Sequence, residues 1–325
     1  MGLIMHQLMK CMMVVERVVD WTLRITGPMY VLLANLLILG VVYVFFTTLL
    51  PLRHPLLSPA GIVHSIAASI LIGNIFFNYF YCIFTDPGQP PSVLRAESHI
   101  DAEIAERFTR WCKKCRKPKP VLAHHCHVCN RCITRMDHHC PWMANCVGHY
   151  NYRYFFNFLW WLWLGCMYSA CMSAPPLPYH RAMKSSERTG LIFSFILSAA
   201  IALAISLLMG WHIYLVTTGQ TTIEFYNNRR DKAAEHSKGS KWINKFHLGA
   251  INNWQEVFDE RGRFWYVTWM LPRTRPHSTN GVFPPTMYNL DEHRDRIVEA
   301  TYVGAGRSSA GNSRQQHTSA AKEIV

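Results

Sequence analysis

The chain has 325 residues, half of them hydrophobic, and a formal net charge of +13 at pH 7. This length fits either two soluble domains or one membrane bundle with parts outside the bilayer. A strongly basic chain raises the question of nucleic-acid binding, which would place basic residues among aromatic ones on a soluble face. Here the basic residues instead flank long apolar segments and a cysteine cluster. Composition therefore favours a membrane protein and predicts no nucleic-acid partner.

The N-terminal arm, residues 1–28, is apolar but carries the charged residues Lys10, Glu16 and Arg17. These charges interrupt the apolar core that a cleavable signal peptide requires. The arm is instead typical of an amphipathic helix that lies at the membrane surface.

Four segments contain no Asp, Glu, Lys or Arg, and each reaches the roughly 20 apolar residues that a bilayer span needs. Buried helices of a soluble core rarely stay free of charge over such a length. The sequence therefore predicts four transmembrane helices, over residues 29–52, 62–84, 154–174 and 191–216. They form two hairpins, 29–84 and 154–216, on either side of a polar loop at 85–153.

The basic residues are distributed unequally between the two sides of these spans. The arm, the loop at 85–153 and the C-terminal region hold 29 Lys and Arg, whereas the other two loops hold 4. Because basic loops are retained in the cytosol, both termini and the polar loop are predicted to be cytosolic.

The C-terminal region divides into two parts by composition. Residues 217–303 contain enough aromatic and apolar residues to form a small packed element, which could lie on the bilayer. Residues 304–325 are rich in Gly, Ser, Gln and Ala, so this tail is predicted to be disordered.

Seven of the eleven cysteines fall between Cys112 and Cys146, in the loop predicted to be cytosolic. Disulfides are disfavoured there, and the repeated Cys-x2-Cys spacing is typical of zinc sites. Two tetrahedral zinc ions need eight ligands, which six cysteines and two histidines would supply. One cysteine is then left over. The candidate is Cys140, which follows Asp137, His138 and His139, because a neighbouring histidine can activate a thiol.

The run DHHCPW at 137–142 closely resembles the cysteine-rich domain of DHHC protein acyltransferases. Three further motifs match that family in order: DPG at 86–88, TTIE at 221–224 and NW at 253–254. The resemblance extends from about the first span to about Trp265. It implies an all-α membrane fold of four transmembrane helices, with a cytosolic zinc-bound domain of short β-hairpins and loops.

The resemblance also implies the zinc ligands. One structural zinc ion would be held by Cys112, Cys115, His125 and Cys132. The other would be held by Cys126, Cys129, His139 and Cys146. The two sites would thus interleave along the chain. With four protein ligands each, the ions would stabilise the domain and take no part in the reaction.

By the same resemblance, the chain is expected to be a zinc-containing protein S-acyltransferase that uses acyl-CoA, such as palmitoyl-CoA, as cosubstrate. Cys140 would be the nucleophile, His138 its base and Asp137 the group that orients His138. The acyl group would pass through Cys140 to a substrate cysteine in a ping-pong reaction. Residues that would support the site are Thr222 and Asn253, with Asp86 and Gly88 in structural roles.

Three groups near the nucleophile are expected to contact acyl-CoA, although each has a simpler explanation. The cations Lys117 and Lys119, with His124, would attract the coenzyme phosphates, or the lysines merely follow the positive-inside bias. Aromatic residues would line the acyl tunnel, or serve as ordinary packing, at Trp142, Phe155 and Phe158. Gly165 would leave room at the far end of the tunnel for longer chains.

Two positions depart from the family pattern. Leu122 stands where the family usually has Arg, and Ala144 stands where it commonly has Asn. The first change would weaken contacts with the coenzyme phosphates. Neither affects a proposed zinc ligand or the Asp-His-Cys set.

Two other kinds of function fit the sequence less well. A zinc-stabilised membrane adaptor without activity would not need the intact set from Asp137 to Cys140. A metal transporter would need ionisable residues inside its spans, where only His64 and His212 occur, both near span ends. The expected partners are therefore the bilayer and proteins with membrane-proximal cysteines. The stretch around Cys140 is most similar to the Abl-philin branch of the family, which implies endoplasmic reticulum or Golgi membranes.

Overall fold

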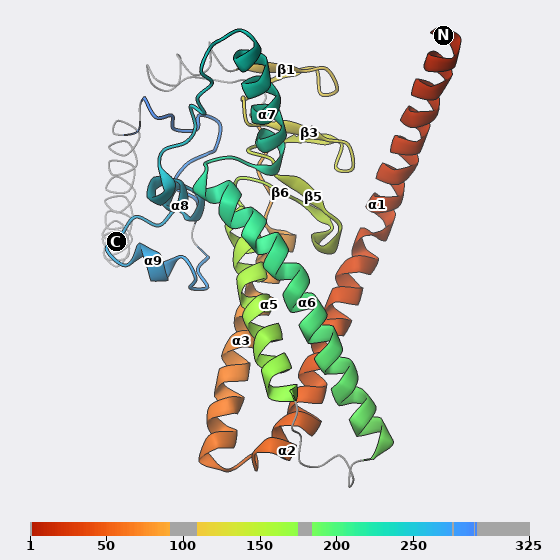
Figure 1. Ribbon diagram of the computed structural model, residues 1–325, viewed down its shortest axis with the longest axis vertical. Coiled ribbons are helices and arrows are strands. Elements are labelled where there is room, and N and C mark those ends of the chain that lie inside the picture. The colour runs from red at the N-terminus through yellow and green to blue at the C-terminus, as the bar shows by residue number, and fades with distance from the viewer. Residues whose placement is uncertain (1, 92–108, 175–183, 275, 289, 291–325) are drawn as a thin grey trace, which may run out of the picture.

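The computed structural model describes residues 2–91, 109–174, 184–274, 276–288 and 290. The predicted disordered tail, 304–325, lies outside the described residues. The molecule is elongated, with a bundle of long helices at one end and small strands and short helices at the other (Figure 1).

Four helices of the described residues are long and apolar enough to cross a membrane: Met5–Arg53, Pro59–Phe84, Tyr152–Ser173 and Ser185–Thr217. The predicted number of spans is confirmed. In terms of secondary structure these are α1 (Gly2–Val44) with η1 (Phe45–Leu49) and α2 (Leu50–Arg53), then α3 (Pro59–Phe84), α5 (Tyr152–Ser173) and α6 (Ser185–Thr217).

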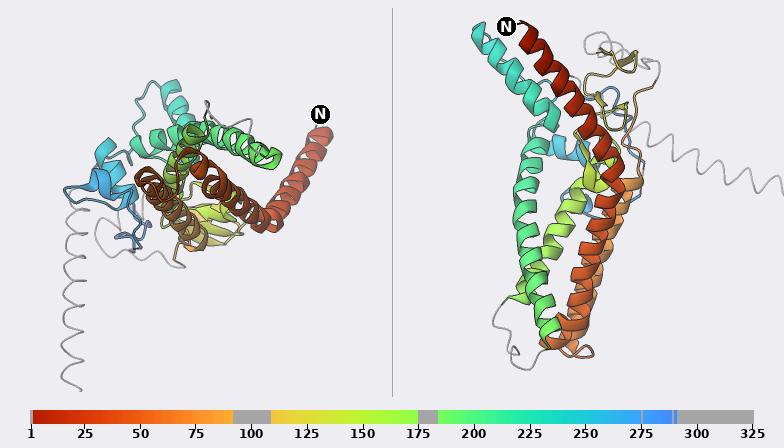
Figure 2. Two further views of the ribbon diagram at one scale, coloured as in Figure 1. Left: turned by 90° about the horizontal axis from the view of Figure 1, so that it is seen from below. Right: turned by 90° about the vertical axis from the view of Figure 1, so that its right-hand side faces the viewer.

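Helix α1 is longer than a bilayer is thick. Its 43 residues extend about 65 Å at 1.5 Å per residue, roughly twice the hydrocarbon thickness. It continues through Pro28, so the predicted boundary between residues 28 and 29 is not marked by the end of a helix. The N-terminal half extends beyond the bundle, alongside the strands (Figures 1 and 2).

At the far end of the bundle, capping and one ion-dipole contact hold the helices in place. Ser58 caps α3 by accepting a hydrogen bond from the Gly61 backbone N–H at 3.1 Å, and Pro59 fits the first turn. The Arg53 guanidinium donates to the Ala174 carbonyl at 2.6 Å, at the end of α5. This contact ties the two helical hairpins together.

The cysteine-rich segment forms three antiparallel hairpins. They are β1 (Arg110–Cys112) with β2 (Lys117–Lys119), β3 (His124–Cys126) with β4 (Arg131–Ile133), and β5 (His138–Cys140) with β6 (Asn145–Val147). A single 3₁₀ turn, η2 (Pro141–Met143), connects the last two strands. Such short strands bury little apolar surface and need additional stabilisation. The predicted fold class, four membrane helices with a domain of short β-hairpins, is confirmed.

Three further helices follow α6: α7 (Thr222–Ser237), α8 (Ala250–Phe258) and α9 (Trp265–Thr268). Helix α7 lies beside the hairpins, whereas α8 packs against α5 and α6 (Figure 1). Helix α7 begins with a capping box, in which Thr221 and Glu224 bond to each other's backbone N–H groups. Phe156 of α5 is fully buried against an aromatic group from α8 and the turn after α9. The predicted packed C-terminal element is thus anchored on α5.

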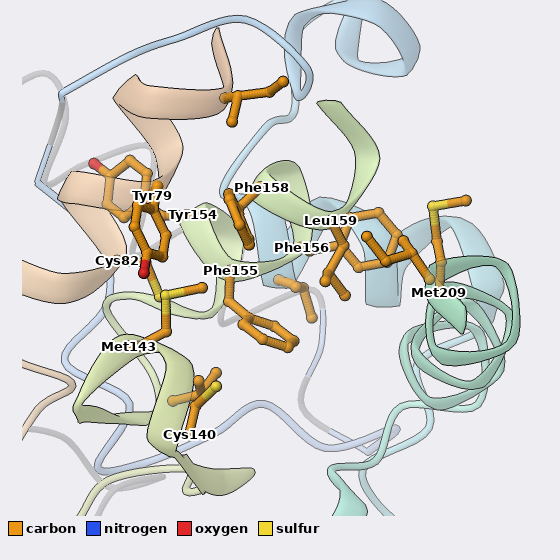
Figure 3. Packing of buried hydrophobic residues seen from close by; sticks show 14 of the residues in the cluster. Tyr79, Cys82, Cys140, Met143, Tyr154, Phe155, Phe156, Phe158, Leu159 and Met209 are labelled. Atoms are coloured by element: carbon orange, nitrogen blue, oxygen red, sulfur yellow. The ribbon is translucent and has the colours of Figure 1, made fainter. Parts of the chain in front are cut away.

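The main hydrophobic cluster joins the bundle to the hairpin domain (Figure 3). It contains Tyr79 and Cys82 from α3, Phe155 and Phe158 from α5, and Cys140 itself. The hairpin that carries Cys140 therefore sits directly on the membrane helices.

Candidate active site and metal clusters

The first metal cluster brings Cys112, Cys115, His125 and Cys132 together, with all four donor atoms within 4.8 Å of one another. The Cys115 sulfur lies 3.2 Å from His125 Nδ1 and 3.6 Å from the Cys132 sulfur. His125 and Cys132 are register partners across β3 and β4.

The second cluster brings Cys126, Cys129, His139 and Cys146 together in the same way. His139 Nδ1 lies 3.4 Å from the Cys129 sulfur and 3.5 Å from the Cys146 sulfur. His139 and Cys146 are again register partners, here across β5 and β6. The two sets interleave along the chain as predicted.

Both clusters fit tetrahedral zinc. Tetrahedral ligands at the usual zinc distances of about 2.0–2.3 Å lie roughly 3.3–3.8 Å apart. The donor atoms of the two clusters are separated by similar distances, from 3.2 Å between the Cys115 sulfur and His125 Nδ1 to 3.8 Å between the Cys126 sulfur and His139 Nδ1. Each Cys-x2-Cys turn is also pre-formed, since the backbone N–H of Cys115 points at the Cys112 sulfur and that of Cys129 at the Cys126 sulfur, at 3.4 and 3.3 Å. A residue with positive φ follows each turn, Arg116 or Asn130.

Cys140 is the cysteine of this segment that belongs to neither cluster. It ends β5, is buried, and faces the cavity described below. The side chain of His139, which precedes it on the strand, points to different surroundings, because strand side chains alternate in direction. The strand therefore places His139 in the metal cluster, and His138 and Cys140 on the other face.

His138 and Asp137 form a close pair beside Cys140. The His138 Nδ1 atom lies 2.6 Å from Asp137 Oδ2. Burial alone would lower the pKa of His138, but this carboxylate and the Cys140 thiol raise it to about 9. With Nδ1 directed to the carboxylate, Nε2 is the nitrogen available to the thiol.

The Asp137 carboxylate is held in place by α7. The Thr222 backbone N–H donates to Oδ1 at 2.9 Å and the Thr222 hydroxyl donates to Oδ2 at 3.0 Å. Burial would raise the pKa of Asp137, but its bonds to His138 and Thr222 lower it. Asp137 is therefore a buried, ionised group whose two oxygens accept three hydrogen bonds, one from His138 and two from Thr222.

A cavity of about 540 Å³ begins at His138 and Cys140 and extends between the membrane helices. Its wall is almost entirely apolar. The residues predicted to line an acyl tunnel, Trp142, Phe155 and Phe158, do line it, as does Gly165. Ser169 and Ser198 form the polar contact at its distant part, with their hydroxyls 3.2 Å apart.

The cations predicted to bind coenzyme phosphates are not part of this cavity wall. Lys117 and Lys119 lie on β2, in the hairpin of the first metal cluster. His124 Nε2 lies 3.8 Å from Glu224 Oε1 on α7. Leu122, at the position where the family usually has Arg, is buried.

Asn253 and Asp86 make structural contacts at a distance from Cys140. Asn253 donates to the Thr217 carbonyl at the end of α6 and accepts from the Leu248 N–H, both at 2.9 Å. Asp86 accepts from the Arg131 guanidinium and from the Gly88 N–H, both at 2.8 Å. These bonds fasten the C-terminal element to α6 and the segment after α3 to the hairpins.

Sequence analysis missed three side chains that anchor the turn beside Cys140. The Tyr79 hydroxyl donates to the Trp142 carbonyl at 2.8 Å. The amides of Asn145 and Asn151 both donate to carbonyls at the end of α3, including that of Cys82. No local pattern marks these residues, because these carbonyl partners lie 60 or more positions away.

A buried histidine on α6 was also not assigned a role. His212 Nδ1 lies 2.8 Å from the Tyr152 hydroxyl, and its ring centre lies 6.0 Å from that of His138. Together with Phe155, it packs beside His138.

Two zinc-type clusters, and a buried thiol that lies beside a His–Asp pair at an apolar cavity between membrane helices, fit a membrane acyltransferase. The DHHC palmitoyltransferase family model matches residues 105–229. The chain belongs to the DHHC palmitoyltransferase family and is a protein S-acyltransferase.

Named relatives support this over most of the chain. Palmitoyltransferase ZDHHC16 of Mus musculus is 32% identical, over 81% of this chain and 75% of its own length. Palmitoyltransferase ZDHHC16A of Danio rerio is 30% identical, over 79% and 77%. Probable protein S-acyltransferase 16 of Arabidopsis thaliana is 34% identical, over 76% and 89%.

Proposed function

We propose that Cys140 carries the acyl group between acyl-CoA and the cysteine of a substrate protein. The observation that supports this most directly is its position. It is the one cysteine of the segment from Cys112 to Cys146 that belongs to neither cluster, and it lines the apolar cavity next to His138. The cavity volume is within the range of about 300–1,000 Å³ that is usual for ligand sites.

In the first step, the Cys140 sulfur attacks the thioester carbonyl carbon of acyl-CoA as a thiolate. Its proton resides on His138, whose raised pKa favours the imidazolium next to Asp137. The new bond is between Cys140 sulfur and the acyl carbon, and the bond that breaks joins this carbon to the coenzyme sulfur. The departing coenzyme thiolate takes the proton from His138.

In the second step, the thiol of a substrate cysteine gives its proton to His138 and attacks the acyl carbon on Cys140. The acyl–Cys140 bond breaks, and the Cys140 thiolate is restored beside the imidazolium. Asp137 stays ionised throughout, because the two bonds from Thr222 and that with His138 favour its charged form.

We propose that the acyl chain occupies the cavity and contacts Trp142, Phe155 and Phe158. The polar part of the coenzyme would then remain outside the bilayer. The candidates for binding its phosphates remain Lys117, Lys119 and His124. The reason is their charge, because they do not line the cavity.

The two clusters would each hold one zinc ion through the ligands described above. Four protein ligands leave no open coordination position, so the ions supply stability to the three hairpins. By placing His139 and Cys146 in a cluster, the protein also fixes the backbone on both sides of Cys140.

For topology, we propose that the hairpin domain and both termini face the cytosol, on the distribution of Lys and Arg. The similarity to the Abl-philin branch supports endoplasmic reticulum or Golgi membranes. Substrates would be proteins whose cysteines lie close to the cytosolic membrane surface.

The test is to incubate purified protein in bilayer nanodiscs with alkyne-tagged palmitoyl-CoA, and to compare wild type with Cys140→Ser. The expected result is a hydroxylamine-sensitive label on the wild type alone, with two zinc ions per chain in both proteins. A label of equal size on Cys140→Ser would contradict the role of Cys140. An unlabelled wild type with full zinc content would contradict transfer through an acyl-enzyme.

A further inference from the structure

One residue of α1 lies unusually close to the turn that follows Cys140. Gly27 is buried, whereas most of the neighbouring residues of α1 are exposed. A Cβ atom on Gly27 would lie 3.1 Å from the Ala144 Cβ and 3.4 Å from the Ala144 Cα. Carbon atoms in ordinary contact are about 3.5–4.0 Å apart, so a side chain at position 27 would push α1 and the turn apart.

Ala144 is suited to this close approach at some local cost. It closes η2 in the left-handed conformation, with φ 47° and ψ 29°. Asn adopts this conformation more readily than Ala does. However, an Asn side chain has three more heavy atoms than Ala. The small residue at 144 and the absent side chain at 27 together permit the contact.

The contact belongs to a continuous face of α1, with residues spaced three or four apart as on one side of a helix. Leu23 packs against the apolar residues around the second metal cluster. Next comes Gly27, and then Tyr30, whose ring meets the Trp142 ring edge-on at 5.3 Å. Ala34 lines the cavity. This face therefore runs from the hairpin domain to the acyl cavity, and Gly27 is its point of closest approach.

The turn contacted by Gly27 is also held by α3. The Tyr79 hydroxyl bonds to the Trp142 carbonyl within η2, which begins directly after Cys140. Helices α1 and α3 therefore both contact the turn that determines where the Cys140 sulfur lies.

We propose that Gly27 is a positioning residue for acyl transfer. Its contact with Ala144 seats α1 against the turn and thereby sets the place of the Cys140 thiol above the cavity. This inference rests on the proposed role of Cys140. It acts through geometry, so it concerns the rate of the reaction rather than the affinity for acyl-CoA.

The experiment compares Gly27→Leu and Gly27→Ala with Gly40→Leu in nanodiscs. Gly40 lies on the same helix, and a Cβ there would meet nothing within 4 Å. We expect Gly27→Leu to lower the acylation rate constant at saturating palmitoyl-CoA about tenfold or more, because small displacements of a reacting group are costly. The KM for palmitoyl-CoA and the zinc content should stay unchanged. Gly40→Leu should match the wild type.

A second-site variant separates positioning from a loss of folding. Gly27→Ala should slow acylation less than Gly27→Leu does. Adding Ala144→Gly to the Gly27→Ala variant should return its acylation rate toward that of the wild type, because the opposing methyl group is removed. The proposal is overturned if Gly27→Leu reacts as fast as Gly40→Leu, or if the double variant is no faster than Gly27→Ala. Cys140→Ser is measured in parallel. A label on that variant would contradict the role of Cys140, whereas a fast Gly27→Leu would contradict only the positioning role.

Discussion

Two strands of this protein have the same three residues and the same pairing, but different surroundings. Strand β3 reads His124-His125-Cys126, and β5 reads His138-His139-Cys140. In each, the middle histidine joins a metal cluster and faces a cluster cysteine across the hairpin. The repeat was not recognised in the sequence analysis.

The difference lies at the two outer positions. Cys126 is a member of the second metal cluster, whereas Cys140 belongs to no cluster and faces the cavity. His138 follows Asp137, which carries a buried carboxylate, whereas His124 follows Ala123. Identical residues on equivalent strands therefore lie in different surroundings, because the two hairpins have different contacts. If Cys140 acts as proposed, the hairpin of β3 serves structure alone, whereas the hairpin of β5 serves structure and chemistry.

The largest difference between the two strands is expected when the last residue of each, Cys140 or Cys126, is replaced by Ser. Cys140→Ser should abolish the hydroxylamine-sensitive label and retain two zinc ions, since it removes the nucleophile alone. Cys126→Ser should lose the zinc ion of the second cluster, because only three of the four ligands remain. The measurement is acyl label and zinc content for both variants, with Cys11→Ser as an exposed-cysteine control. A Cys126→Ser protein with two zinc ions and full stability would contradict the cluster assignment.

Removing zinc should destabilise the hairpin of β3 and the hairpin of β5 together. A strong chelator at moderate temperature should release about two zinc ions per chain, unfold the hairpin domain and abolish acylation, since structural zinc supplies much of the folding free energy of small domains. The check is zinc release followed in parallel with near-ultraviolet circular dichroism. Full acylation by a zinc-free protein would show that the clusters are not needed.

A smaller effect is expected from the histidine pair. His138→Ala should lower the acylation rate about 10²–10⁴-fold through loss of the proton acceptor. His124→Ala should leave the rate constant close to that of the wild type, because His124 faces Glu224 and not the cavity. Single-turnover rates at saturating palmitoyl-CoA make this comparison. Equal losses in the two variants would remove the distinction between the strands.

The smallest effect on the site of acylation is expected when β3 is made more like β5. Ala123→Asp gives β3 the sequence Asp-His-His-Cys and should lower the stability of the hairpin, because Ala123 is fully buried. Cys126 should nevertheless remain in its cluster and Cys140 should remain the acyl carrier. Peptide mapping of the labelled protein tests this. Label on Cys126 would mean that the carboxylate alone selects the reactive thiol, without the cavity.

Local patterns in the sequence were sufficient for the spans and for the presence of zinc-type sites. The charge-free segments predicted four membrane helices and the cysteine spacing predicted two zinc sites, whereas the division of the ligands into two sets came from the family resemblance. Both are properties of residues near one another in the chain. Thr222 was reached through a motif rather than through spacing, and it does bond to Asp137.

Contacts between distant segments could not be derived in this way. Tyr79 and Asn145 use backbone carbonyls as partners, and any residue can supply a carbonyl. The approach of Gly27 to Ala144 depends on how α1 leans against the hairpin domain, which no periodicity reports. Nor did charge alone locate Lys117, which lies on the hairpin of the first metal cluster and not at the cavity wall.

The bonds that tie the turn after Cys140 to α3 have a consequence for which cysteines can react. The Tyr79 hydroxyl and the Asn145 amide fix that turn to a helix that crosses the bilayer. The Cys140 sulfur is therefore held at a fixed height along the membrane-spanning helix α3. If Cys140 carries the acyl group as proposed, the first requirement for a substrate protein is that its cysteine lies at the same height relative to the membrane. Many unrelated sequences can meet that requirement.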